Sequence, residues 1–138
     1  MSELITGKCL CGFVKYEYAG KLGKASYCHC EDCKRATGGP YTVGVLASFM
    51  DFSIISGHTS SYTTIGDSGR KVSRDFCPKC GSPIFTKSEV CPDLIFIKAG
   101  SLDKPELAKP SLHTWIQHAV PWAFIEKNLP EYEDNGPS

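Results

Sequence analysis

Eight cysteines are the residues of this sequence whose type and spacing could do chemistry. They stand at Cys9, Cys11, Cys28, Cys30, Cys33, Cys77, Cys80 and Cys91. Thiolates are ligands that zinc prefers in proteins, and cysteines one or two residues apart can face a common point. A disulfide framework is the alternative for a short cysteine-rich chain, but disulfides within such tight groups would be strained. The spacing therefore favours metal binding, while disulfides between the groups stay sterically possible.

In two of the cysteine groups, a glycine directly follows the second cysteine. Gly12 follows Cys11, and Gly81 follows Cys80. A glycine at that position lets the backbone adopt a positive φ and bring N–H groups toward sulfur, which offsets the thiolate charge. The sequence therefore predicts one closed zinc site made of Cys9, Cys11, Cys77 and Cys80. The alternative is that each pair binds its own ion with other ligands.

The middle group, Cys28, Cys30 and Cys33, supplies three ligands and leaves one tetrahedral position without a cysteine. Structural zinc sites are closed by four protein ligands, whereas catalytic sites keep a position for water or substrate. The spacing therefore predicts an open, catalytic site, and with it two zinc ions per chain. A fourth protein ligand is the alternative, and its candidates are Cys91, His29, His58, His113 and His118.

The composition fits one globular domain and excludes several classes of protein. Of 138 residues, 41% are hydrophobic and 22% are charged, as in ordinary folded proteins. The 15 Lys and Arg balance the 15 Asp and Glu, so the chain lacks the basic field that captures nucleic acid. No apolar run approaches the roughly 18 residues of a membrane helix, and the first residues lack the pattern of a signal peptide. We therefore expect a cytoplasmic protein without nucleic-acid or membrane partners; the sequence carries no signal for an oligomeric state.

Short stretches of β-type sequence, separated by turns that contain glycine, must position the cysteines. Alternating aromatic and β-branched residues predict strands at 13–18, 41–47, 52–55, 61–65, 72–76, 83–86 and 94–98. One helical turn is expected at 31–36, beside the middle cysteines. The pattern is typical of a mainly β protein, with a folded domain at 5–130 and a polar C-terminal tail at 131–138.

Three motifs, taken in order, resemble one protein family. They are Gly7-Lys8-Cys9-Leu10-Cys11-Gly12, then Cys28-His29-Cys30-Glu31-Asp32-Cys33-Lys34-Arg35, then Phe76-Cys77-Pro78-Lys79-Cys80-Gly81. The chain resembles the glutathione-dependent formaldehyde-activating enzyme family, which includes centromere protein V, over about residues 5–130. The resemblance implies a β-tent of short antiparallel sheets stapled by zinc, related to zinc exchange-factor and methionine sulfoxide reductase folds.

The resemblance also implies an activity and a division of labour between two zinc ions. Family members carry a structural zinc on the outer motifs, here Cys9, Cys11, Cys77 and Cys80. A second zinc, taken to be catalytic, is held by the middle motif, here Cys28, Cys30 and Cys33. The reaction that names the family joins glutathione and formaldehyde to form S-hydroxymethylglutathione, and its reverse is that of a carbon–sulfur lyase.

Residues beside the middle motif could bind a small thiol substrate such as glutathione. Lys34 and Arg35 would attract its carboxylates, and the backbone near Thr37 and Gly38 would add N–H donors. Lys34 stands where the family commonly has arginine, and lysine lacks the planar fork that pairs with a carboxylate. Two alternatives stay open: a zinc-stabilised binding module without catalysis, and a redox enzyme that uses Cys91, although Cys91 has no adjacent base.

Overall fold

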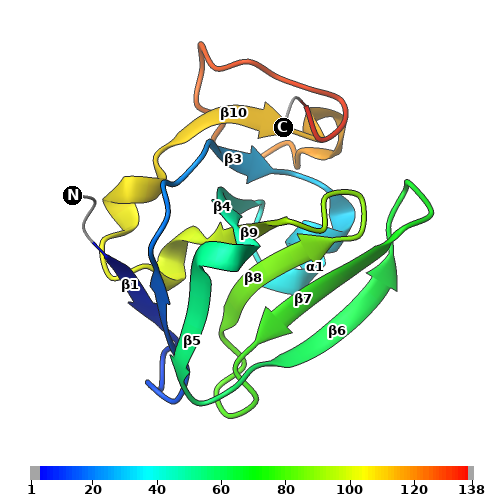
Figure 1. Cartoon of the computed structure of the whole chain (residues 1–138). Coiled ribbons are helices and arrows are strands. Elements are labelled where there is room, and N and C mark those ends of the chain that lie inside the picture. The colour runs from blue at the N-terminus through cyan, green and yellow to red at the C-terminus, as the bar shows by residue number, and fades with distance from the viewer. Residues whose placement is uncertain (1–3, 137–138) are drawn as a thin grey trace.

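The computed structural model describes residues 4–136, which form two β-sheets and, within that range, one α-helix (Figure 1). The strands are β1 (Ile5–Lys8), β2 (Lys15–Tyr18), β3 (Ala25–Cys28), β4 (Thr42–Ser48), β5 (Phe52–Ser56), β6 (Ser60–Ile65), β7 (Lys71–Phe76), β8 (Pro83–Ser88), β9 (Leu94–Lys98) and β10 (Pro110–Thr114). The helix is α1 (Glu31–Thr37), and the short 3-10 turns are η1 (Phe49–Asp51), η2 (Ala99–Ser101), η3 (Pro105–Ala108) and η4 (Ile116–His118). The mainly β fold expected from the sequence is confirmed. Across residues 4–136, no helix has the length and apolar character needed to cross a membrane.

The two sheets differ in size. The smaller sheet has the strand order β1-β2-β5, and the larger one has the order β10-β3-β4-β9-β8-β7-β6. Figure 1 shows the larger sheet curving from β10 and β3 down to β6. Neighbouring strands are antiparallel except β3 and β10, which are parallel. This pair departs from the expected antiparallel sheets because its strands are far apart in the chain, so no hairpin sets their direction.

The seven predicted strands are present, with ends shifted by no more than two residues, and the predicted helical turn became α1. Three further strands, β1, β3 and β10, lie outside the predicted set. Each is short, and β1 contains a glycine while β10 begins at a proline, so their local propensity is weak. Pairing with neighbours from other parts of the chain makes them strands.

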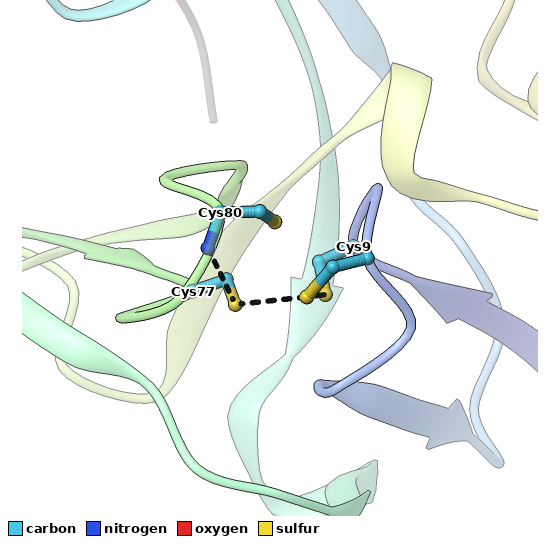
Figure 2. Close-up of side chains that lie close together, drawn as sticks. Cys9, Cys77 and Cys80 are labelled. Atoms are coloured by element: carbon cyan, nitrogen blue, oxygen red, sulfur yellow. Dashed lines mark hydrogen bonds between the residues drawn. The ribbon is translucent and has the colours of Figure 1, made fainter.

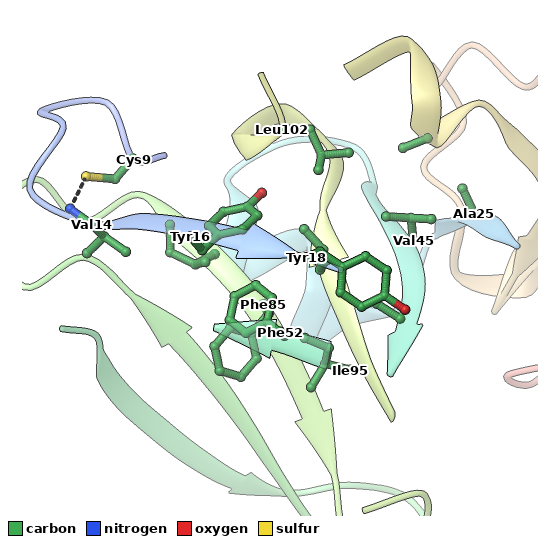
Figure 3. Packing of buried hydrophobic residues seen from close by; sticks show 14 of the residues in the cluster. Cys9, Val14, Tyr16, Tyr18, Ala25, Val45, Phe52, Phe85, Ile95 and Leu102 are labelled. Carbon is green, nitrogen blue, oxygen red and sulfur yellow. Dashed lines mark hydrogen bonds between the residues drawn. The ribbon is translucent and has the colours of Figure 1, made fainter. Parts of the chain in front are cut away.

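The core lies between the two sheets (Figure 3). The rings of Tyr16 and Phe52 of the smaller sheet pack in a tilted arrangement with centroids 5.0 Å apart, and Phe52 meets Phe85 of β8 edge-on at 5.2 Å. Val45 and Ile97, paired across β4 and β9, are fully buried on the same side. Aromatic rings therefore connect the two sheets through the core.

Residues on the other face of the larger sheet alternate with those of the core. Because Val45 and Ile97 point into the core, Thr42 and Lys98 point to the opposite side. Cys28 pairs with Thr42 and shares that side. The larger sheet thus gathers a cysteine, a hydroxyl and a cation on one face, next to the start of α1.

The C-terminal segment packs along β10. His113 donates its backbone N–H to the carbonyl of Pro130 (2.8 Å), and Tyr132 donates to the carbonyl of His113 (2.9 Å). Trp122 and Phe124, between these two stretches, are 74% and 83% exposed. The segment is therefore attached by backbone hydrogen bonds rather than by those two aromatic side chains.

Candidate metal centres

Two turns from different sheets bring four cysteines together. Cys9 and Cys11 lie between β1 and β2, and Cys77 and Cys80 lie between β7 and β8. Their four Sγ atoms all lie within 4.8 Å of one another. Figure 2 shows the two turns facing each other across this four-cysteine group. The structure thus gathers the pairs that the sequence grouped, rather than leaving them at separate sites.

The sulfur spacing in the four-cysteine group fits a tetrahedral metal ion. The Sγ atoms of Cys9 and Cys11 lie 3.7 Å apart, and those of Cys11 and Cys77 lie 3.8 Å apart. Four thiolates at about 2.3 Å from a central zinc would have edges of about 3.8 Å. All eight cysteines belong to the described residues, and all are free. The disulfide alternative is therefore wrong for this chain: the sulfurs stand at the distance of ligands, not of bonded partners.

Backbone N–H groups point at the sulfurs, as the glycines led us to expect. The N–H of Val14 donates to Sγ of Cys9 at 3.2 Å, and the N–H of Cys80 donates to Sγ of Cys77 at 3.4 Å. The Ser82 hydroxyl lies 3.1 Å from Sγ of Cys80, and its hydrogen bond lowers the pKa of Cys80 to about 5. These donors stabilise the thiolate form, which is the form that binds metal.

Gly12 and Gly81 both adopt the left-handed conformation, with φ of 81° and 80°. In that conformation the N–H of Gly12 donates to the carbonyl of Cys9 (3.2 Å), and the N–H of Gly81 donates to the carbonyl of Cys77 (2.9 Å). The predicted positive φ is confirmed at both positions.

A strand end and a helix start position the other three cysteines. Cys28 ends β3 and is paired with Thr42 of β4 and Thr114 of β10. Cys30 caps α1: its Sγ accepts the N–H of Cys33 at 3.2 Å. The three Sγ atoms lie within 4.8 Å of one another. This three-cysteine group could also hold a metal ion, since three thiols converge from a rigid strand and a capped helix.

The three thiols hold their protons unequally. Hydrogen bonds from Cys30 and Cys33 lower the pKa of Cys28 to about 2. The same interactions with Cys28 raise the pKa of Cys30 and of Cys33. An ion that bound all three sulfurs would displace the protons that remain on them.

No fourth His, Cys, Asp or Glu of residues 4–136 places a ligand atom in the three-cysteine group. His29 and His113 instead face each other, with His29 Nε2 3.0 Å from His113 Nδ1. His118 lies in η4, Cys91 lies in the turn before β9, and His58 is exposed before β6. Among the described residues, the three-cysteine group therefore offers three protein ligand atoms to a metal ion.

A cavity of about 200 Å³ adjoins the three-cysteine group at Cys33. Its lining includes Thr37 and Thr42 and two cationic residues, Arg74 of β7 and Lys98 of β9. A second cavity of about 610 Å³ also borders Thr37, Thr42 and Lys98. Space for a small molecule therefore lies beside a candidate metal ligand.

The two cations of this cavity were missed from the sequence. Burial lowers the pKa of Lys98, while the sulfurs of Cys33 and Cys28 act in the opposite direction. Arg74 donates from Nη1 to Oγ1 of Thr64 at 3.3 Å. Both residues stand on strands without a cysteine motif. The one available signal was alternation, which places Lys98 on the face opposite to Ile97.

The four residues proposed from the sequence to bind substrate lie in different surroundings. The ammonium of Lys34 donates to the carbonyl of His118 at 2.5 Å, and Arg35 is exposed on α1. Gly38 ends the helix in the left-handed conformation, with its N–H bonded to the carbonyl of Lys34 at 2.8 Å. Thr37 lines both cavities. Of the four, Thr37 is thus the residue that borders the space beside the three-cysteine group.

Comparison with known proteins agrees with this geometry. The crystal structure of a Rhodobacter sphaeroides protein, a structural genomics target, matches with a TM-score of 0.60 at 21% sequence identity and covers 76% of this chain and 96% of that chain. That likeness shows a shared fold. No curated protein matches the chain. Residues 4–118, which contain all three cysteine motifs, match the family described as glutathione-dependent formaldehyde-activating enzyme. The chain therefore belongs to the glutathione-dependent formaldehyde-activating enzyme family.

Proposed function

We propose that the chain holds two zinc ions and acts as a carbon–sulfur lyase on the adduct of a thiol and a carbonyl compound. Family membership supports an enzyme-like activity. The observation that carries the proposal is the three-cysteine group, in which three Sγ atoms converge without a fourth ligand from the described residues. The adjoining cavity at Cys33 supplies room for a substrate.

The two zinc ions would have different tasks. The four-cysteine group supplies a complete tetrahedral shell and joins the turn after β1 to the turn after β7, so its ion would be structural. The three-cysteine group supplies three ligands, and its ion would be catalytic. There the zinc would supply a coordination position that binds a thiol and favours its thiolate form.

The proposed reaction forms one carbon–sulfur bond. The thiol sulfur bonds to the carbonyl carbon of formaldehyde, and the thiol proton ends on the carbonyl oxygen to give an S-hydroxymethyl product. The reverse reaction breaks the same bond and returns the proton to sulfur. Glutathione, the thiol in the family's name, is the first substrate to test. Thr37 and Thr42 line the space in which this thiol would be oriented.

The predicted substrate residues divide among three roles in this proposal. Thr37 would contact the substrate, because it borders both cavities. Arg35, exposed on α1, would attract an anionic thiol from solution. Lys34 and Gly38 would hold the helix in place, since both are bonded to backbone carbonyls.

Cys30→Ser tests the proposal without removing the helix cap. A serine hydroxyl can accept the N–H of residue 33 as the sulfur does, so α1 keeps its N-cap. Metal analysis should give two zinc ions per chain for the wild type and one for Cys30→Ser. The variant should lose exchange between formaldehyde and glutathione, followed by NMR of the S-hydroxymethyl product. Cys91→Ser, outside both groups, should keep both ions and the exchange.

The same experiment separates the proposal from a binding module without catalysis. If wild-type protein with two zinc ions neither exchanges formaldehyde nor binds a thiol at its metal, the lyase proposal is wrong and both sites are structural. If Cys30→Ser keeps two zinc ions, the assignment of the second site to the three cysteines is wrong.

A further inference from the structure

We infer that Arg74 and Lys98 form an anion site that holds the carboxylate of the thiol bound at the three-cysteine group. The inference rests on the proposed function, which it extends by naming the residues that would hold a carboxylate of the bound thiol. It also assigns specificity to two strand residues rather than to the basic residues of the cysteine motif.

The placement of the two cations supports this site. Arg74 and Lys98 come from β7 and β9, on either side of β8. Both line the cavity of about 200 Å³ that Cys33 also lines. A molecule whose sulfur lay at the open position beside Cys33 could therefore extend into a space bordered by both positive charges.

Arg74 has unused hydrogen-bonding capacity. Its Nε is buried and has no hydrogen-bond partner among the described residues. Its Nη1 makes one long bond, 3.3 Å, to Oγ1 of Thr64. A buried donor without a partner is costly, and the guanidinium fork matches the two oxygens of a carboxylate. A bound carboxylate would supply the partner that Arg74 lacks.

The acidic residue of the cavity lining already has a hydrogen-bond partner. Asp75 also lines the cavity, but its Oδ2 accepts the hydroxyl of Thr59 at 2.6 Å. Two cations thus stand against one carboxylate in the lining, beside the sulfur of Cys33. Lys98 also interacts with the sulfurs of Cys33 and Cys28. Compensation of the thiolates is therefore the competing role for Lys98, and the experiment must separate the two roles.

The size of the cavity indicates what part of a ligand it takes. Sites for drug-sized molecules have roughly 300–1,000 Å³. A cavity of about 200 Å³ suits one end of a molecule, a carboxylate on a short chain. The adjoining cavity of about 610 Å³, which shares Lys98, has room for the rest of a larger thiol such as a peptide.

The test compares two ligands that differ in one charge. Cobalt-substituted protein is titrated with 3-mercaptopropionate and with its methyl ester, and the change in the cobalt absorption bands gives a Kd for each. We expect the wild type to bind the acid at least about tenfold more tightly than the ester. Arg74→Gln and Lys98→Gln should each reduce this ratio to within about threefold and leave the Kd of the ester unchanged. Arg70→Gln, which removes an exposed cation before β7, should keep the full ratio.

Conservative variants keep the test decisive if a glutamine variant fails to fold. Arg74→Lys keeps the charge but loses the planar fork, so it should fold and lose most of the preference for the acid. Lys98→Arg should retain that preference. Folding is checked by the cobalt content of each variant.

The outcomes distinguish the inference from the proposed function. If neither ligand perturbs the cobalt bands of the wild type, the proposed thiol site itself is wrong. If both ligands bind the wild type equally, the anion site is wrong and the proposed function stands. If the glutamine variants weaken acid and ester alike, the two cations serve the bound thiolate, and the anion site is likewise overturned.

Discussion

Nε2 of His29 lies 3.0 Å from Nδ1 of His113, and both imidazoles are fully buried. Nε2 of His113 lies 2.9 Å from the backbone carbonyl of Glu126, which can only accept, so that nitrogen carries a proton. Nδ1 of a neutral His113 is then the acceptor for the Nε2–H of His29. His29, which lies between Cys28 and Cys30, is thus connected through His113 to Glu126 of the C-terminal segment.

Replacing His113 should destabilise the fold. His113→Phe would leave the buried Nε2–H of His29 and the carbonyl of Glu126 without partners, at a cost of about 2–3 kcal/mol in the free energy of unfolding. Urea denaturation measures this loss. His58→Phe, at an exposed position, is the control and should change the free energy by less than about 0.5 kcal/mol. Equal stabilities for the two variants would contradict the role given to the histidine pair.

Alkaline pH should weaken the fold through Tyr16. Burial raises the pKa of Tyr16 to about 12, although the hydrogen bond with Ser101 acts in the opposite direction. Between pH 10 and 12 the unfolded chain loses this proton before the folded chain does, so stability is full below pH 10 and falls as the pH rises. The loss from this group is about 3 kcal/mol at most.

Tyr16→Phe is the control for that pH dependence. The phenylalanine variant cannot ionise at this position, so its free energy of unfolding should fall less steeply between pH 10 and 12. Chemical denaturation at several pH values gives both curves. Parallel curves for wild type and variant would rule out Tyr16 as the source of the slope.

Gly7 should not tolerate a side chain. A Cβ at Gly7 would lie 2.2 Å from Cζ of Tyr16 and 2.5 Å from the carbonyl oxygen of Ser101. Because Tyr16 is fully buried and the carbonyl is backbone, neither can move away easily. We expect Gly7→Ala to lose about 3 kcal/mol or more in thermal unfolding. Gly12→Ala meets no atom within 4 Å and suffers only its positive φ, so it should lose about 1 kcal/mol.

Loss of an ion bound by the four-cysteine group should loosen the attachment between the sheets. Cys80→Ser is expected to lose one zinc ion and at least about 3 kcal/mol of stability, since a structural ion contributes directly to folding. Metal analysis and chemical denaturation measure the two effects. A chelator should lower the stability of the wild type in the same direction and change that of Cys80→Ser less. Full metal content in Cys80→Ser would show that the ion does not need this sulfur.

The sequence predicted those features that depend on backbone conformation and side-chain alternation within a short segment. The glycines after Cys11 and Cys80 anticipated the left-handed turns and, through them, the grouping of four cysteines. Alternation anticipated the seven strands that carry β-branched and aromatic residues. These features depend on backbone conformation and side-chain period, which a single sequence displays.

Features that depend on contacts between distant segments were not predictable in the same way. The parallel pairing of β10 with β3 brings His113 beside Tyr27, and their rings stack at 4.8 Å. Arg74 and Lys98 line one cavity because β7, β8 and β9 are neighbours in one sheet. Nothing in the residues around either cation distinguishes it from an ordinary surface charge, so the cavity they share follows from topology.

The cysteines of the four-cysteine group enter the chain at very different times during synthesis. Cys11 and Cys77 are separated by 66 positions, and their sulfurs end 3.8 Å apart. A polypeptide growing on the ribosome therefore contains the first two of these cysteines long before the other two have been added. Coordination of an ion by all four sulfurs would have to wait until more than half of the protein has been translated, so full capture of such an ion would be a late event in biogenesis.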